Sequence, residues 1–318
     1  MGASSHHSLG SMLFIIDPIE TLQQEKDTSI AIMRAAHQRG WRVFYTTPET
    51  LTLQDGVLYA DLSLVSATAH LPLTGSAVLE KRPVDACQVV WMRQDPPVDQ
   101  RYLYTTYLLE TLKHARVLNH PRSVRDCNEK LFALEFADLC PEAQVTASSK
   151  AIRAFAQQHG RIVLKPLDGL GGRGVFSLTA NDSNLSVVIE TLTQNGRQPI
   201  MVQRYIPEIS AGDKRLLMLF GQPLDVVLAR VPAAEDFRGN MAAGATVRGQ
   251  RISSVERRIA ERVSPVLQAK GLDFVGLDII GEYLTEINVT SPTGICQLNA
   301  IFNRNIADEF LQQLEKMA

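Results

Sequence analysis

Three polar side chains stand in two apolar stretches near the C-terminal end of the chain, where a plain core would hold aliphatic residues. The stretches cover residues 274–280 and 283–289, and they carry Asp278, Glu286 and Asn288. Glu286 and Asn288 are two residues apart, so they share one face of a strand. Converging oxygen ligands of this kind suit Mg²⁺, which also bridges substrate phosphates. Structural pairing between polar groups is the alternative.

The turn between these two stretches decides whether Asp278 joins the other two side chains. A two-residue turn at Gly281 and Glu282 puts Asp278 on the opposite face of the sheet. A three-residue loop at residues 281–283 brings all three side chains together. The sequence leaves both possibilities open.

A glycine-rich loop at residues 169–174, here called the glycine flap, follows a strand-like run at residues 161–164. The flap contains G-x-G-x-x-G, but residues 175–179 alternate like a strand, whereas a dinucleotide-binding fold needs a helix there. We therefore predict a hairpin whose backbone N–H groups cover phosphates. Lys165, at the end of the buried run, needs an anionic partner, which is either a phosphate or a carboxylate of the protein.

A second strand-like run, at residues 200–206, ends at Pro207 and is followed by Glu208 and Asp213. A connection of this kind can offer backbone groups to an adenine edge and a carboxylate to a ribose. An ordinary strand with a solvated polar end is the alternative.

Residues 235–250 are rich in glycine and alanine and poor in large apolar side chains. We predict a mobile loop that closes over bound substrates, since it has little apolar surface to hold it against a core. Arg238 and Arg248 are its expected contacts to anions.

Strands alternate with helices in the first part of the chain, which predicts a parallel α/β sheet. Asp17 and Arg93 each follow a predicted strand, where such sheets hold ligands, although from spacing alone an ordinary loop residue is the commoner case. The predicted elements are strands at residues 13–16, 41–45 and 89–92, and helices at residues 29–39, 130–139 and 151–159.

The composition excludes several classes of protein. The chain has 318 residues, of which 45% are hydrophobic, and 32 Lys and Arg balance 34 Asp and Glu. A nucleic-acid-binding protein normally shows a basic excess, and a membrane span needs about 20 consecutive apolar residues. The cysteines form no C-x-x-C pair, so we expect reduced thiols and a cytoplasmic protein; they are Cys87, Cys127, Cys140 and Cys296.

Several motifs resemble those of the prokaryotic glutathione synthetases of the ATP-grasp superfamily: NEKLFA, VLKPLDG, GDKR, GLDIIG, LTEINVTSPT and MRQDPP. The resemblance implies an α/β fold of the α+β ATP-grasp type, with an N-terminal parallel α/β domain followed by a two-lobed ATP-grasp module. We expect the N-terminal domain at residues 12–127, a lid subdomain at residues 128–206, and a C-terminal subdomain with the metal site at residues 207–318. Residues 1–11 look like the remnant of an expression tag.

The resemblance also assigns roles to individual residues. Those implied at ATP are Lys130, Lys165, Gly169, Gly171, Gly172, Gly174, Gln203, Arg204, Tyr205, Ile206, Glu208 and Asp213. Those implied at the metal are Asp278, Glu286 and Asn288, and those at the reacting phosphoryl and acyl groups are Arg215 and Arg230. Those implied at the peptide and glycine are Asp17, Ser29, Arg93, Arg238, Asn240, Thr290 and Ser291.

The activity implied by the resemblance is the ATP-dependent ligation of γ-glutamylcysteine to glycine through an acyl phosphate. ATP is then a cosubstrate, two magnesium ions are expected with manganese as a substitute, and the protein is a homo-oligomer, either a tetramer or a dimer. No nucleic-acid or membrane partner is expected. Residues 242–246 and 294–296 depart from the family pattern. These departures bear on loop closure and on the details of substrate binding.

Two other functions remain open on the sequence. One is an ATP-grasp ligase that joins a different carboxylate to a different amine. The other is a nucleotide-binding regulator without turnover, although binding alone needs fewer charged residues than the chain retains. The ligase mechanism requires no nucleophilic side chain, which agrees with the lack of a recognisable Ser/His/Asp or Cys/His pattern.

Overall fold

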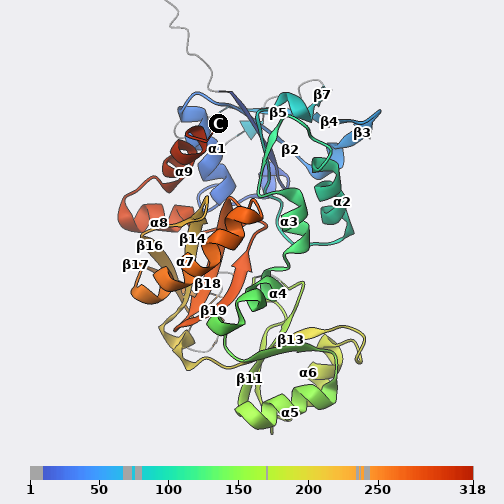
Figure 1. The fold of residues 1–318 in the computed structure, drawn as a ribbon, viewed down its shortest axis with the longest axis vertical. Helices are drawn as coiled ribbons and strands as arrows, with labels where there is room; N and C mark the ends of the chain where they lie inside the picture. Colours follow the sequence, from blue (N-terminus) through green and yellow to red (C-terminus); the bar gives the residue numbers. More distant parts are fainter. Residues whose placement is uncertain are drawn as a thin grey trace, which may run out of the picture.

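The computed structural model describes residues 10–66, 74–75, 81–169, 171–233, 236, 238–239 and 244–317. The strands of this part of the chain form sheets of six, four, six and three strands. In Figure 1 the N-terminal sheet lies at the top, the second six-stranded sheet in the middle and the four-stranded sheet at the bottom.

Four strands of the N-terminal sheet confirm the predicted parallel α/β arrangement, because β1 runs parallel to β2 and β8, and β8 runs parallel to β9. At the other edge, β5 pairs antiparallel with β2 and with β6. All of β8 is buried, as expected for a strand covered on both faces. The strand order is β6-β5-β2-β1-β8-β9, with β1 (Ser11–Ile15), β2 (Arg42–Thr46), β5 (Ser63–Ser66), β6 (Thr74–Gly75), β8 (Val89–Met92) and β9 (Arg116–Leu118). A smaller sheet contains β3 (Thr52–Gln54), β4 (Val57–Asp61) and β7 (Lys81–Pro83).

The helices of the N-terminal domain begin at side-chain caps. The Asp27 carboxylate accepts a hydrogen bond from the N–H of Ile30, and Asp99 does the same for Tyr102. The helix predicted at residues 29–39 is confirmed to within one residue. The helices are α1 (Thr28–Gln38), α2 (Gln100–Leu109) and α3 (Pro121–Asp126).

The four-stranded sheet is antiparallel, with the order β10-β13-β11-β12, and two helices pack on it. It has an apolar core of its own, which includes Ile152, Leu164 and Val202. The elements are β10 (Ala143–Thr146), α5 (Ser149–His159), β11 (Arg161–Pro166), β12 (Phe176–Thr179), α6 (Leu185–Leu192) and β13 (Ile200–Arg204).

The second six-stranded sheet is also antiparallel and carries the two apolar stretches of the metal prediction as β18 and β19. Its order is β17-β16-β14-β18-β19, with β15 paired to β14. The strands are β14 (Asp213–Leu219), β15 (Gln222–Pro223), β16 (Val226–Val231), β17 (Thr246–Arg251), β18 (Phe274–Ile280) and β19 (Tyr283–Asn288). The helices are α7 (Ser254–Ala269), α8 (Ile295–Phe302) and α9 (Ile306–Glu315).

The N-terminal domain and the C-terminal subdomain share one hydrophobic core. The Trp91 ring of β8 lies 5.4 Å from Phe274 of β18 and 5.0 Å from Phe310 of α9, measured between ring centroids. Figure 1 shows α9 beside α1. At this contact Arg39 forms ion pairs with Asp308 and Glu315.

Two predicted elements differ from the structure. The helix predicted at residues 130–139 is a short α4 (Glu129–Ala133) followed by a 3-10 helix η4 (Leu134–Leu139), with non-helical backbone at Phe136. Phe132 and Phe136 are buried in the core of the main body, so this part of the predicted lid subdomain does not pack with the four-stranded sheet.

The loop predicted at residues 235–250 is wrong at its C-terminal end, because β17 begins at Thr246 and pairs with β16 along its whole length. Residues 235, 237 and 240–243 of this segment lie outside the described residues.

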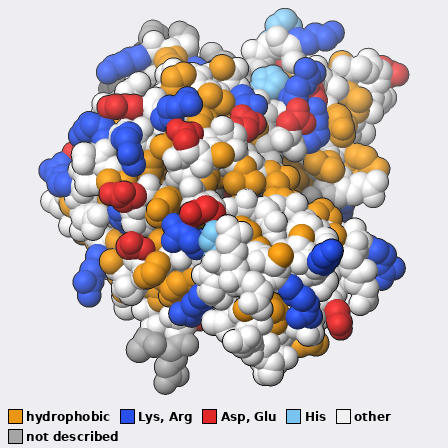
Figure 2. Space-filling view, turned by 60° about the horizontal axis from the view of Figure 1, so that its bottom comes forward, with side chains coloured by type: hydrophobic (Ala, Val, Ile, Leu, Met, Phe, Trp, Pro, Cys, Tyr) orange, Lys and Arg blue, Asp and Glu red, His pale blue; other side chains and the backbone are white. Residues whose placement is uncertain are grey.

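None of the described helices is both long enough and apolar enough to cross a membrane. Figure 2 shows Lys and Arg side chains interspersed with Asp and Glu on the face that it views. This agrees with the formal net charge of −2.

Candidate functional site

A cavity of about 320 Å³ lies where the three parts of the fold meet. The four-stranded sheet contributes Lys165 and Gln203, the β18–β19 hairpin contributes Asp278 and Glu286, and the N-terminal domain contributes Asp95. The other predicted site residues that line it are Lys130, Gly169, Gly171, Gly172, Arg204, Tyr205, Ile206, Asp213, Arg215, Arg230, Arg238, Asn288, Thr290 and Ser291.

The glycine flap covers one side of the cavity. β11 and β12 pair antiparallel, which confirms the predicted hairpin and excludes a dinucleotide-binding βα unit. Gly171 and Gly172 have φ of +61° and +79°, which side chains rarely tolerate. A Cβ on Gly169 would lie 2.8 Å from the Pro166 ring, so only glycine fits there. Gly174, unlike the other three predicted glycines, is not among the residues that line the cavity.

Lys165 lies at the end of β11 and donates from Nζ to Oε1 of Gln203 at 2.9 Å. Burial lowers the pKa of Lys165, although the negative charge of Glu286 opposes that effect. Lys165 forms no ion pair with any described residue, so no carboxylate in this part of the chain is its partner. Its charge therefore remains available to an anion in the cavity.

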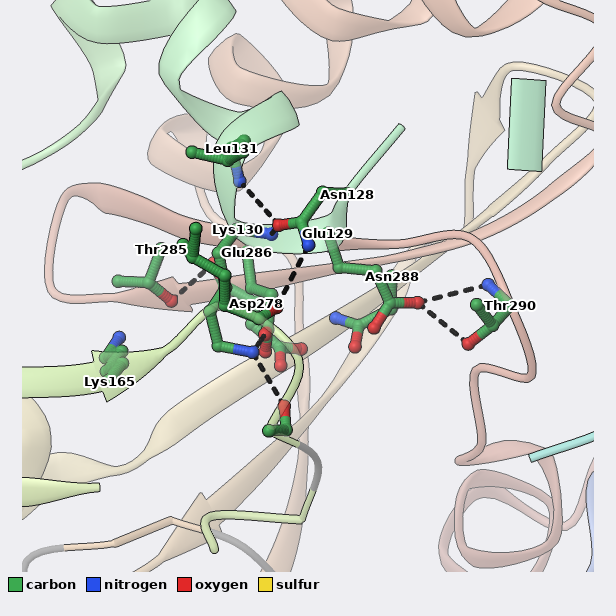
Figure 3. Close-up of polar contacts among 12 residues, drawn as sticks. Asn128, Glu129, Lys130, Leu131, Lys165, Asp278, Thr285, Glu286, Asn288 and Thr290 are labelled. Carbon is green, nitrogen blue, oxygen red and sulfur yellow. Dashed lines mark hydrogen bonds and ion pairs between the residues drawn. The ribbon is translucent and has the colours of Figure 1, made fainter. Parts of the chain in front are cut away.

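Lys130 is buried at the start of α4 and donates from Nζ to Gly169 O at 2.7 Å (Figure 3). The same nitrogen lies 3.0 Å from Oε1 of Glu286. Burial lowers the pKa of Lys130, but the charge of Glu286 and its hydrogen bond outweigh burial, and the pKa is raised. Asn128 caps α4 and donates to Leu167 O at 3.0 Å, which ties the helix to the glycine flap.

The β18–β19 hairpin resolves the question of register. Ile280 pairs with Tyr283, so the turn has two residues, yet Asp278 pairs with Glu286. The two pairings agree because Thr285 is an extra residue, a β-bulge, that shifts the register by one. The Thr285 hydroxyl donates to Asp278 O at 3.1 Å and holds the bulge.

Asp278 is held by two arginines. Arg215 donates to both carboxylate oxygens, at 2.8 and 2.7 Å, and Arg230 lies 2.9 Å from Oδ2. Burial by itself raises the pKa of Asp278, but the two guanidinium groups together outweigh burial and hold the pKa well below its usual range. Both oxygens of this predicted metal ligand are therefore already engaged, whereas Glu286 and Asn288 face the cavity beside Lys130.

Asp213 and Glu208 were the two candidates for a ribose contact. Asp213 Oδ2 lies 2.5 Å from Arg230, while its Oδ1 is buried without a partner among the described residues. Burial raises the pKa of Asp213 to about 6, although Arg230 opposes the shift. Glu208 packs against Gly281 and is not among the lining residues, so the geometry favours Asp213.

The predicted adenine hinge lines the cavity at residues 203–206. The backbone N–H groups of Arg204 and Tyr205 donate to Glu142 O and Arg161 O. Among the described residues, the N–H of Ile206 has no backbone acceptor, so it is available to an adenine edge.

The N-terminal domain closes the other side of the cavity. Asp95 and Pro96 line it, and the Ser291 hydroxyl donates to Oδ1 of Asp95 at 2.6 Å. Asp17 lies one layer behind, where its Oδ2 accepts from the Asp95 N–H at 2.9 Å. Burial also raises the pKa of Asp17.

Arg93 is buried in the same second layer. It donates to Ser29 Oγ at 3.1 Å and to Pro292 O at 3.0 Å, while its Nη1 has no partner among the described residues. Burial lowers the pKa of Arg93 to about 10. Arg93, Ser29 and Asp17 therefore support the cavity wall and do not line it.

Three residues of the predicted closing loop have different outcomes. Arg238 lines the cavity, pairs with Asp236 and donates to Gly172 O of the flap at 3.3 Å. Arg248 is exposed on β17 and does not line the cavity. Asn240 lies outside the described residues.

Glu129 and Thr285 also line the cavity, although their sequence context does not predict a functional role. Glu129 follows the Asn128 cap in the first turn of α4, where an acidic residue is common in any helix and gives no functional signal. Thr285 reads as an ordinary strand residue, because the bulge has no glycine to mark it.

Models of two protein families match the chain. The model described as prokaryotic glutathione synthetase, N-terminal domain, matches residues 11–125, and that of the ATP-grasp domain matches residues 129–303. The glutathione synthetase of Pseudomonas syringae pv. tomato is 46% identical over 305 residues, which is 95% of this chain and 96% of that protein. The glutathione synthetase of Vibrio vulnificus strain YJ016 is 44% identical over 308 residues, with coverage of 95% and 96%.

Solved structures share the fold at low sequence identity. The D-cycloserine synthetase DcsG has a TM-score of 0.67 at 14% identity, covering 96% of this chain and 99% of that one. A Chryseobacterium gregarium RiPP-associated ATP-grasp ligase in complex with ADP also has a TM-score of 0.67, at 16% identity, with coverage of 97% of both chains. These similarities concern the architecture alone.

Proposed function

This chain belongs to the family of prokaryotic glutathione synthetases, and we propose that its cavity is where ATP, γ-glutamylcysteine and glycine meet. The chain is an ATP-dependent carbon–nitrogen ligase that makes glutathione from the last two. In such a reaction the peptide carboxylate takes the γ-phosphoryl group of ATP and leaves ADP. Glycine then attacks the acyl phosphate and displaces phosphate.

The nucleotide occupies the side of the cavity formed by the four-stranded sheet and the glycine flap. Lys130 and Lys165 hold the phosphates, because Lys130 is a buried and Lys165 a half-buried cation at the cavity, and Lys165 has no carboxylate partner among the described residues. Residues 203–206 hold the adenine, and Asp213 accepts from the ribose with its unpartnered oxygen. Charge neutralisation of this kind is the main catalytic need in phosphoryl transfer.

The metal site consists of Glu286 and Asn288, with Asp278 beside them. The Glu286 side chain is 25% exposed and pairs with a cation already, namely Lys130. Asn288 donates its amide N–H to Gly276 O at 3.2 Å, which leaves its oxygen for an ion. This hard-oxygen set fits a divalent cation such as Mg²⁺, which when bound neutralises phosphate charge. We also propose two magnesium ions, with manganese as a substitute.

Arg215 and Arg230 serve the reacting groups. Both are buried at the cavity and are oriented by Asp278, so they need little reorganisation when charge develops on the phosphoryl group or on the acyl oxygen. Arg238, which contacts the flap, helps to exclude water that would hydrolyse an acyl phosphate. Thr290 and Ser291, together with Asp17, Ser29, Arg93 and Asn240, position the peptide and glycine.

One observation carries this assignment of roles: the two lysines, the Glu286–Asn288 pair and the two arginines line a single cavity beneath the glycine flap. The test is oxygen transfer. With γ-glutamylcysteine labelled by heavy oxygen in its cysteinyl carboxylate, we expect the label in the released phosphate. Unlabelled phosphate would exclude an acyl phosphate at this cavity.

The remaining proposals concern the whole protein. By the family resemblance we propose a homo-oligomer, a tetramer or a dimer, that works in the cytoplasm. The free thiols of all four cysteines agree with a reducing compartment. Sedimentation of the purified protein would test the oligomeric state.

A further inference from the structure

The carboxylate of Glu129 is fixed at the edge of the cavity by three hydrogen bonds to one of its oxygens. Oε1 accepts from the N–H of Val289 at 2.9 Å, from the N–H of Thr290 at 3.1 Å and from the Thr290 hydroxyl at 2.8 Å. These donors directly follow the metal-site residue Asn288. The carboxylate is therefore held rigidly against the end of β19 (Figure 3).

The second oxygen of Glu129, Oε2, has no recorded partner in the described part of the chain, and the side chain lines the cavity. Its neighbour Lys130 is directed instead to Glu286 and Gly169. Burial raises the pKa of Glu129, and the nearby charge of Glu286 raises it further, while the hydrogen bonds of the Thr290 and Val289 groups oppose both effects. Glu129 is half-buried, so its open oxygen is accessible from the cavity and can bind a cation there.

We propose that Glu129 binds the ammonium group of the incoming glycine; this rests on the proposed function of the cavity. Oε1 is held by the protein and Oε2 is presented to the substrate. The carboxylate of glycine then turns toward the arginines of the cavity. Glu129 is a substrate-binding residue in this account, and Thr290 is its positioning residue.

The amine of glycine fits this place better than the amine of γ-glutamylcysteine. The glycine nitrogen must come within about 3–3.5 Å of the acyl carbon, so it binds beside the phosphate and metal groups. Glu129 is next to Lys130 and close to Glu286 of that centre. The ammonium of the dipeptide is at the far end of its γ-linked glutamyl group, well away from the acyl carbon.

The test compares Glu129→Gln with the wild type. The amide oxygen of glutamine can accept the same hydrogen bonds, so the substitution removes the charge and keeps the shape. We expect the KM for glycine to rise about ten- to a hundredfold, as for loss of a charge-assisted contact. The KM values for ATP and γ-glutamylcysteine and the magnesium requirement should stay within about twofold.

Hydroxylamine separates binding of the ammonium from damage to the active site. It is uncharged at neutral pH and traps an acyl phosphate as a hydroxamate, with release of phosphate. We expect Glu129→Gln to form hydroxamate at the wild-type rate while glycine ligation falls. Glu282→Gln, in the exposed turn of the β18–β19 hairpin, makes the same charge change and should alter neither reaction.

Thr290→Val provides a second variant, because it keeps the charge of Glu129 but removes one of its three supports. A smaller rise in the KM for glycine than in Glu129→Gln is expected. The proposal is overturned if glycine dependence is unchanged in Glu129→Gln, if hydroxamate formation falls equally, or if the KM for γ-glutamylcysteine or the magnesium requirement shifts instead. Absence of glycine ligation in the wild type would instead contradict the proposed function.

Discussion

Lys165 is the cation of the cavity whose contacts point most directly to a phosphate, because among the described residues it bonds to a neutral amide and to no carboxylate. We expect Lys165→Ala to raise the KM for ATP and to lower kcat, since the contact exists in both ground and transition states. A charge-assisted hydrogen bond is worth about 1.5–3 kcal/mol, so kcat/KM should fall about ten- to a hundredfold. Lys150→Ala, exposed on α5, is the control for steady-state kinetics. Unchanged ATP dependence would contradict the phosphate role.

Glu286 is the carboxylate of the cavity best placed for a metal. We expect Glu286→Gln to remove most turnover at low magnesium and to recover part of it at high magnesium, because a hard cation loses one anionic ligand. Titration of activity with MgCl₂ at saturating substrates measures this. Wild-type activity at low magnesium would show that Glu286 serves only to pair with Lys130.

Asp213 is predicted to contact the ribose through its unpartnered oxygen. Asp213→Asn should raise the KM for ATP several-fold, whereas Glu208→Gln should have a much smaller effect because Glu208 does not line the cavity. Comparison of ATP with its 2′-deoxy and 3′-deoxy analogues on both variants measures the contact. An equal effect of the two substitutions would remove the distinction drawn between them.

At the residue scale, the sequence reveals polar and charged side chains that stand among apolar strand residues. Lys165, Glu286 and Asn288 were found in this way, because a buried strand otherwise selects against them. Glu129 was not found, since an acidic residue in a first helical turn is ordinary. Arg93 is predicted to lie near ligands because it follows a strand of a parallel sheet. It lies one layer behind the cavity wall, because the packing of side chains around it cannot be read from residue spacing.

At the scale of elements, the hairpin shows where prediction from sequence stops. Its two strands could be read from the sequence, but the length of the turn stayed open, and the bulge at Thr285 could not be predicted because no glycine marks it. Without the bulge a two-residue turn would put Asp278 on the face opposite Glu286. The helix at residues 130–139 was predicted too long for a related reason, since tertiary packing of Phe136 overrides local propensity.

Thr285→Ala tests the role of the bulge. Loss of the hydroxyl removes the hydrogen bond to Asp278 O, so we expect the free energy of unfolding to fall by about 1 kcal/mol. The magnesium requirement should rise as well, because the bulge sets the position of Glu286. Urea unfolding and magnesium titration measure the two effects, with Thr179→Ala on an exposed strand as the control. A destabilised variant with a normal magnesium requirement would show that the bulge does not position the metal ligand.

At the scale of the whole molecule, the N-terminal sheet and the C-terminal sheet depend on one another. Phe310 of α9 is fully buried against Trp91, Phe220 and Phe274. Phe310→Ala should lower the free energy of unfolding by about 3–5 kcal/mol, because it leaves a cavity between the two sheets. Chemical denaturation followed by tryptophan fluorescence and by circular dichroism measures this, with Met317→Ala as an exposed control. Loss of one signal well before the other would mean that the two parts unfold independently.

The packing of the two sheets also fixes the shape of the cavity. Asp95 follows a strand of the N-terminal sheet, Ser291 follows a strand of the C-terminal sheet, and a hydrogen bond joins their side chains. In the proposed function, this cavity couples ATP cleavage to ligation. The most direct measurement follows ADP and glutathione together in the purified protein with ATP, magnesium, γ-glutamylcysteine and glycine. We predict equal amounts of ADP and glutathione, and neither product in quantity when γ-glutamylcysteine is omitted. ADP release that is independent of γ-glutamylcysteine, or ADP without glutathione when all substrates are present, would contradict the account.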